Sequence, residues 1–199
     1  MLVSRRWVLV AAAAMGAAPA AWAADPLLTP RTLGDSTAKI HVVEYFSLTC
    51  THCAEFQRVT FPEVKTELID TGKVQWEWRD FPLDKVALAA AAVARALPSQ
   101  QYEPFISTLL GTQDRWAFAR NVDTTEELAK VAALAGMPRS VFDQAINDQA
   151  MQKAILTAQN QAEKDHGVNS TPTFLINGKP LVGAVDYTAF LAAVNAAQS

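Results

Sequence analysis

Two cysteines, at positions 50 and 53, stand where a strand pattern gives way to a helix pattern, and they constrain this chain more than any other feature. Residues 40–46 are rich in β-branched and aromatic side chains and predict a strand. Beyond the cysteines, apolar residues at 56, 59, 64 and 68 predict a helix. The pair is therefore expected at a helix N-terminus, where free N–H groups and a partial positive charge favour a thiolate.

The two cysteines are expected to have different roles. Cys50 begins the helix and is predicted to be the exposed, attacking thiolate, whereas Cys53 lies a turn inside and is predicted to be the shielded, resolving thiol. His52 can donate a hydrogen bond or a positive charge to the Cys50 sulfur. A Cys50–Cys53 disulfide is expected in an oxidising compartment. Because closing so short a loop contributes only about 2 kcal/mol, a redox role explains the pair better than a structural one.

Residues 1–23 are expected to be a signal peptide that is removed on export. Arg5 and Arg6 form a basic start, an apolar stretch follows, and Ala21–Trp22–Ala23 fits the A-x-A cleavage pattern. The apolar part is shorter than the roughly 20 residues that a membrane span needs, so no stable membrane anchor is expected after cleavage. The Arg pair also resembles a twin-arginine signal, but the general secretory route is favoured because such pairs are common.

Composition excludes several classes of protein. Half of the 199 residues are hydrophobic, which is ample for the core of one ordinary domain. The net charge of −3, without a basic stripe, argues against nucleic-acid binding. A metal site is not expected, because Cys50, Cys53 and His52 would need a distant histidine as the fourth zinc ligand.

The remaining patterns predict an α/β fold interrupted by helices. They place a short lead-in at 25–31, a strand at 74–81, four or five alanine-rich helices at 83–166, a hairpin at 173–182 around Asn177–Gly178, and a final helix capped by Asp186. Breaks between the helices are expected at 98–99, 111, 121–125 and 136–138. Thr124 and Glu127 are predicted to form a capping box.

Two segments resemble the DsbA-like group of the thioredoxin superfamily. They are Val42–Val43–Glu44–Tyr45–Phe46–Ser47–Leu48–Thr49–Cys50–Thr51–His52–Cys53 and Thr171–Pro172–Thr173–Phe174–Leu175–Ile176–Asn177–Gly178. The resemblance covers essentially the whole mature chain. It implies a thioredoxin fold in two parts, 24–82 and 167–199, with an inserted helical domain at 83–166. It also implies that Pro172 is cis and faces the cysteines, and that no cofactor is bound.

The proline loop and the motif are also expected to bind substrate. Thr171 can offer its backbone N–H and C=O to an extended peptide, and we expect Thr51 and Pro172 to contact that peptide as well. The best-known oxidases of the group carry Pro–His between the cysteines and Val before the cis-proline, where this chain has Thr51–His52 and Thr171. These departures leave the oxidising strength and the preferred direction of reaction open.

Glu44 is predicted to be a buried acid with a part in the chemistry. Strand alternation places it on the same face as Val42 and Phe46, among apolar side chains. Burial raises a carboxyl pKa, and the resemblance implies that this acid moves the proton of the second cysteine. The alternative is an ordinary salt bridge, for example with Arg79.

These features predict a periplasmic dithiol oxidase. The resemblance implies that thiol-containing exported proteins are its substrates and that a quinone-linked inner-membrane oxidase restores its disulfide. Residues 24–39 are too few to form an added dimerisation domain, so a monomer is expected. The alternatives are an isomerase or reductase of the same fold, a holdase that binds peptides without turnover, and a glutathione-dependent isomerase of small aromatic compounds.

Overall fold

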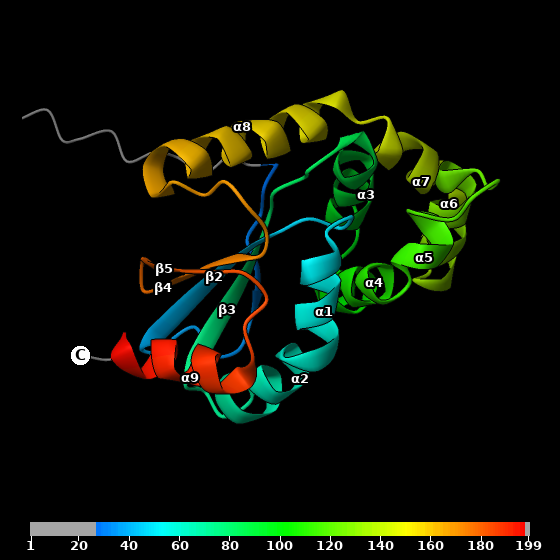
Figure 1. The fold of residues 1–199 in the computed structure, drawn as a ribbon. Coiled ribbons are helices and arrows are strands. Elements are labelled where there is room, and N and C mark those ends of the chain that lie inside the picture. Colours follow the sequence, from blue (N-terminus) through cyan, green and yellow to red (C-terminus); the bar gives the residue numbers. More distant parts are fainter. Residues whose placement is uncertain (1–26, 198–199) are drawn as a thin grey trace, which may run out of the picture.

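The computed structural model describes residues 27–197, so the predicted signal peptide lies outside the described residues. The chain alternates strands and helices, with a long helical block after the third strand (Figure 1). The elements are β1 (Arg31–Leu33), β2 (Ile40–Phe46), α1 (Thr51–Val59), α2 (Phe61–Val64), the π-helix η1 (Lys65–Ile69), β3 (Val74–Asp80), α3 (Lys85–Arg95), α4 (Ser99–Gly111), α5 (Gln113–Trp116), α6 (Thr124–Leu134), α7 (Arg139–Ile146), α8 (Gln149–His166), β4 (Thr173–Ile176), β5 (Lys179–Val182) and α9 (Tyr187–Ala196).

The five strands form one mixed sheet in the order β1-β3-β2-β4-β5. β2 and β3 are parallel, and the other neighbouring pairs are antiparallel. Strand β1 was not expected, because residues 25–31 are predicted only as a lead-in. Arg31 to Leu33 pair with Trp78 to Trp76 of β3, so this short strand owes its conformation to a partner far along the chain.

The sheet separates two layers of helices. In Figure 1, α8 lies over one face, while α1, α2 and α9 lie on the other side. Alternation along β2 explains the arrangement, because Val43 and Tyr45 share a cluster with Ala162 of α8, whereas Val42 and Phe46 belong to the larger core on the α1 side. Glu44 has the same parity as Val42 and Phe46, and so it lies on the face that carries α1.

Aromatic rings fill the core between α1, the sheet and α9. Phe56 of α1 lies 4.6 Å from Phe174 and 5.9 Å from Phe190, measured between ring centroids. Trp76 is fully buried and lies 5.7 Å from Phe190. Trp76 and Trp78 are both core residues, and this packing fixes α1 against the strand that follows the proline loop.

The helical block contains six helices, α3 to α8, one or two more than predicted. The missed break separates α7 from α8, where Asp148 accepts a hydrogen bond from the amide of Met151 and caps α8. The predicted capping box of Thr124 and Glu127 is wrong. Asp123, one residue earlier, is the N-cap of α6 and accepts from the amides of the second and third helical residues.

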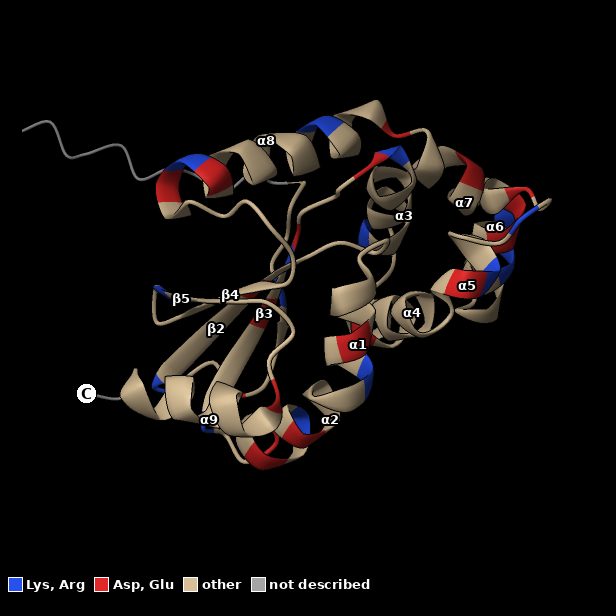
Figure 2. Ribbon diagram, viewed as in Figure 1, with Lys and Arg blue, Asp and Glu red and all other residues tan. Residues whose placement is uncertain are grey.

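A buried ion pair joins this block to the sheet. Arg95 of α3 donates to the Asp80 carboxylate at 2.6 Å, and Tyr102 of α4 donates to the same carboxylate at 3.2 Å. Acidic and basic residues are interspersed along α8 and around α5 to α7 (Figure 2), as expected for solvated faces. Within residues 27–197, no helix is long and apolar enough to cross a membrane.

Candidate active site

Cys50 is the N-cap of α1, at the end of a short loop that follows β2. Its backbone is extended, with φ −82° and ψ 118°, so its side chain turns back over the first turn of the helix. The Cys50 sulfur accepts a hydrogen bond from the amide of Cys53 at 3.4 Å. This geometry is that of a side-chain cap, with sulfur in place of the usual oxygen.

Hydrogen bonds lower the pKa of the Cys50 thiol to about 5. The largest cause is donation from the Cys53 thiol, which outweighs the opposing effect of burial, and the backbone amides of Cys53 and His52 act in the same direction. Burial is the first cause of the opposite change at Cys53, whose pKa is raised well above its ordinary value. At neutral pH the reduced pair therefore holds one thiolate and one thiol.

Both cysteines are free thiols in the structure. Cys53 is fully buried, as predicted for a shielded thiol, but Cys50 is only 6% exposed. The expectation of an openly exposed first cysteine is therefore too strong. The proline loop accounts for the difference, because it lies directly against the Cys50 sulfur.

The Thr171–Pro172 peptide bond is cis, as the resemblance implies. Antiparallel pairing of β4 with β2 sets Thr173 opposite Tyr45, and this register brings the preceding loop to the cysteines. The Cys50 thiol donates to the Thr171 carbonyl at 3.3 Å. The Thr171 hydroxyl favours the thiolate, and it is buried without a hydrogen-bond partner among the described residues. When the Cys50 thiol ionises, it can no longer donate to the Thr171 carbonyl. The Thr171 hydroxyl can then donate to the thiolate.

Glu44 is 2% exposed, and burial raises the pKa of its carboxyl to about 8. The indole groups of Trp76 and Trp78 partly oppose this shift, although their nitrogens and the Glu44 Oε2 atom have no hydrogen bond of normal geometry within residues 27–197. The alternative of a salt bridge to Arg79 is wrong, because Arg79 pairs with Glu77 at 2.8 Å. Glu44 is therefore a neutral acid near pH 7, and its charge would raise the pKa of Cys53 further.

His52 and Thr51 lie on the outer side of α1, and both residues are exposed. The imidazole of His52 is 71% exposed and lies 3.8 Å from the Glu55 carboxylate. The contribution of His52 to the low pKa of Cys50 comes from its backbone amide. Thr51 is the first residue of α1, directly after Cys50.

Sequence reasoning missed two residues that hold the loop before α1. Asp84 accepts a hydrogen bond from the Thr49 hydroxyl at 2.6 Å while it caps α3. Gln113 donates to the backbone carbonyls of Leu48 and Cys50. Asp84 before an alanine-rich helix is recognisable as a cap, but no local pattern indicates its second partner or either partner of Gln113.

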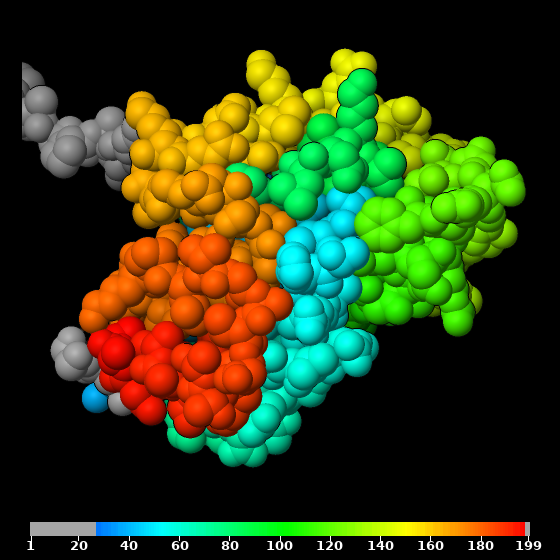
Figure 3. Space-filling view, in the orientation of Figure 1, coloured from blue at the N-terminus to red at the C-terminus, as the bar shows by residue number. Residues whose placement is uncertain are grey.

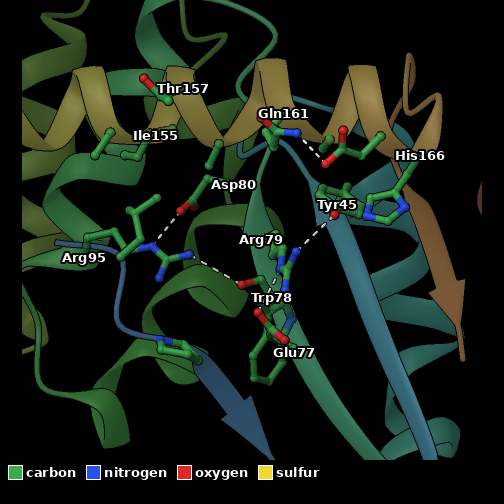
Figure 4. A pocket seen from close by; sticks show the side chains of 16 residues that line it. Tyr45, Glu77, Trp78, Arg79, Asp80, Arg95, Ile155, Thr157, Gln161 and His166 are labelled. Carbon is green, nitrogen blue, oxygen red and sulfur yellow. Dashed lines mark hydrogen bonds and ion pairs between the residues drawn. The ribbon is translucent and has the colours of Figure 1, made fainter. Parts of the chain in front are cut away.

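A cavity of about 600 Å³ lies on the opposite face of the sheet, between β3 and α8. Tyr45, Trp78, Arg79 and Gln161 line it (Figure 4), and none of the predicted site residues does. The candidate site at the cysteines is therefore separate from this cavity. Among the described residues, no group of three or more His, Cys, Asp or Glu side chains could hold a metal ion.

Comparisons with known proteins agree with this geometry. A thioredoxin family model matches residues 27–196. A Rickettsia prowazekii protein named as a protein-disulfide oxidoreductase is 33% identical over 147 residues, which cover 73% of this chain and 53% of the relative. The chain thus spans about half the length of that relative.

Two further relatives match over nearly their whole length. The thiol:disulfide interchange protein DsbA of Bordetella pertussis is 27% identical over 209 residues, covering 94% of this chain and 92% of the relative. The crystal structure of α-DsbA1 from Wolbachia pipientis has a TM-score of 0.79 and 31% identity, covering 87% of this chain and 92% of its own. The chain therefore belongs to the thioredoxin superfamily, in the DsbA-like group of thiol:disulfide interchange proteins.

Proposed function

We propose that this chain is a thiol–disulfide oxidoreductase that works as a dithiol oxidase, introducing disulfides into exported proteins in the periplasm. The observation that carries the proposal is the asymmetry of the pair. Hydrogen bonding lowers the pKa of the Cys50 thiol to about 5, while Cys53 is fully buried and its pKa is raised. A thiol with a low pKa is a good leaving group, and a stabilised thiolate favours the reduced enzyme, so the disulfide form is oxidising.

Two exchange steps transfer the disulfide to the substrate. A substrate thiolate attacks the Cys50 sulfur of the Cys50–Cys53 disulfide, and the electron pair of the broken bond goes to Cys53, which takes up a proton. Glu44, whose carboxyl pKa is raised to about 8 by burial, can supply that proton. A second substrate thiolate then attacks the substrate sulfur of the mixed disulfide, and Cys50 leaves as the thiolate. The substrate loses two electrons and the enzyme gains two.

The proline loop is proposed to hold the substrate during this exchange. The Thr171 carbonyl lies 3.3 Å from the Cys50 sulfur, so a peptide that pairs with the Thr171 backbone brings its own cysteine to the reacting atom. Pro172 fixes the turn of this loop, and exposed Thr51 borders the same approach. Binding through backbone groups is compatible with many client sequences.

The partners follow from the same proposal. Thiol-containing exported proteins are the substrates, and a quinone-linked inner-membrane oxidase restores the Cys50–Cys53 disulfide. We propose that the mature chain, after removal of residues 1–23 by the general secretory or twin-arginine route, works as a monomer. A sedimentation mass near twice that of the chain at micromolar concentration would instead support an isomerase-like dimer.

Equilibration with glutathione buffers tests the direction of the reaction. We expect a reduction potential well above the value of about −270 mV that is typical of thioredoxin. Cys50→Ser is expected to abolish oxidation of a reduced, unfolded client, and Cys53→Ser to accumulate mixed disulfides. A potential near that of thioredoxin would support a reductase. Full protection of a client from aggregation by Cys50→Ser, with no oxidation by the wild type, would support a holdase.

A further inference from the structure

Gln113 reaches from the helical block to the main chain of the redox loop. It is the first residue of α5 and is only 6% exposed. Its amide nitrogen donates to the carbonyl of Leu48 at 2.8 Å and to the carbonyl of Cys50 at 3.0 Å. A primary amide carries two N–H groups, so each carbonyl can receive one of them.

The Cys50 carbonyl is directly coupled to the position of its sulfur. The same carbonyl accepts the first backbone bond of α1, from the amide of Ala54 at 3.1 Å. With this bond on one side and Gln113 on the other, the peptide group after Cys50 cannot rotate without losing a buried hydrogen bond. The backbone angles of Cys50 in turn set the direction of its side chain, which places the sulfur 3.4 Å from the Cys53 amide.

Within residues 27–197, the other hydrogen bonds that join the helical block to the redox loop or to α1 involve residues other than Cys50. Asp84 holds the Thr49 hydroxyl, and the Leu83 amide donates to the Ser47 hydroxyl at 3.3 Å. Gln57 of α1 donates to the Ser107 hydroxyl of α4 at 2.6 Å. In Figure 3 the cyan surface of α1 lies between the green surface of the helical block and the orange to red surface of the C-terminal part. Gln113 differs because one of its partners is the backbone of the attacking cysteine itself.

We propose that Gln113 is a positioning residue for disulfide exchange, which holds the Leu48 and Cys50 carbonyls so that the Cys50 sulfur stays aligned with the N-terminus of α1. The inference rests on the proposed function, because alignment matters only where Cys50 reacts. Through Gln113 the helical block would orient the redox loop, and so it would influence the reactivity of Cys50.

A matched pair of substitutions tests this role in the full chain. Gln113→Met removes both donors with little change in side-chain volume. Gln57→Met makes the same chemical change at a side chain that is also buried, at 9% exposure, and that also joins α1 to the block without contacting Cys50. The Cys50 thiolate is titrated by its absorbance near 240 nm, and the equilibrium of each protein with glutathione is measured.

For Gln113→Met we expect the pKa of Cys50 to rise by roughly one unit, because a misaligned sulfur loses part of its charge-assisted hydrogen bonding. The glutathione equilibrium should move by up to about tenfold towards the disulfide form of the enzyme. Gln57→Met should lower the melting temperature without moving either value. Unchanged Cys50 titration in Gln113→Met, or equal shifts in both variants, would overturn the inference.

The test still decides the inference if Gln113→Met does not fold, or if the wild type does not react with glutathione. If Gln113→Met does not fold, Gln113→Asn replaces it, because its amide is too short to reach both carbonyls and yet keeps the site polar. The same rise in the pKa of Cys50 is expected, and an unchanged value counts against the inference. If the wild type does not exchange with glutathione at all, the proposed oxidase function fails, while the thiol titration still decides whether Gln113 aligns the sulfur.

Discussion

At the scale of single residues, the site contains two groups whose pKa values are shifted in opposite directions, Cys50 and Glu44. Hydrogen bonds lower the Cys50 pKa from 9.0 to about 5, so the thiolate stabilises the reduced fold increasingly as pH rises between these values. Burial raises the Glu44 pKa from 4.5 to about 8, so this carboxyl destabilises the fold increasingly as pH rises through that window. The reduced fold releases one proton at Cys50 and retains one at Glu44, and between about pH 5 and pH 8 the two effects cancel.

We therefore expect the free energy of unfolding of the reduced wild type to change little between about pH 5 and pH 8. In reduced Glu44→Gln it should rise by about 1.4 kcal/mol per pH unit, because the Cys50 effect remains alone. In Cys50→Ser it should fall with pH, because Glu44 then acts alone. Urea titrations across this range under reducing conditions give all three slopes. Parallel slopes in the three proteins would show that these groups do not titrate as described.

At the scale of elements, the start of α3 has two tasks. Asp84 accepts a cap hydrogen bond from the Ala87 amide at 2.8 Å and another from the Thr49 hydroxyl at 2.6 Å. Asp186 at the start of α9 accepts only the corresponding cap bond, from Ala189 at 2.8 Å, among the contacts that the described residues make with its side chain. Asp186 therefore serves as a control for Asp84, because it caps a helix without also contacting the redox loop.

We expect Asp186→Ala to lower the free energy of unfolding by about 1 kcal/mol, the usual loss of an N-cap. Asp84→Ala should lower it by about 2 kcal/mol, because the buried Thr49 hydroxyl also loses its shorter hydrogen bond, the 2.6 Å bond to the carboxylate, and keeps only the Ser47 hydroxyl at 3.3 Å. Alkylation of Cys50 should be faster in Asp84→Ala than in the wild type and unchanged in Asp186→Ala. Equal losses of stability, together with equal alkylation rates, would mean that the Thr49 contact does not restrain the loop.

At the scale of the whole molecule, the low Cys50 pKa determines which redox form is more stable. At pH 7 a folded pKa of about 5 stabilises the reduced protein by about 2.7 kcal/mol relative to its unfolded chain. Closing the short disulfide loop stabilises the oxidised protein by about 2 kcal/mol. We expect the reduced form to have the higher urea midpoint at pH 7, and the disulfide form to overtake it as pH falls towards 5. A higher midpoint for the disulfide form at pH 7, with equal slopes, would contradict the oxidase proposal.

The sequence by itself was sufficient for features whose cause is local. The run from Val42 to Phe46 predicts a strand because β-branched and aromatic side chains favour one, and Asn177–Gly178 predicts a hairpin because both residues accept positive φ. Cys50 at the end of such a strand, before a helix, indicates a thiolate site on the same local grounds. Alternation in β2 also places Glu44 among buried neighbours, and its side chain is 2% exposed.

Tertiary structure alone decided the features that depend on distant parts of the chain. Strand β1 forms because Arg31 to Leu33 pair with β3. Cys50 is covered because the loop before β4 brings the Thr171 carbonyl to its sulfur. Gln113 lies 63 residues from Cys50 in the sequence, and nothing near it indicates which carbonyls its amide will meet. A propensity or a cap acts between neighbours along the chain, whereas the identity of a buried hydrogen-bond partner exists only once packing has brought the two groups together.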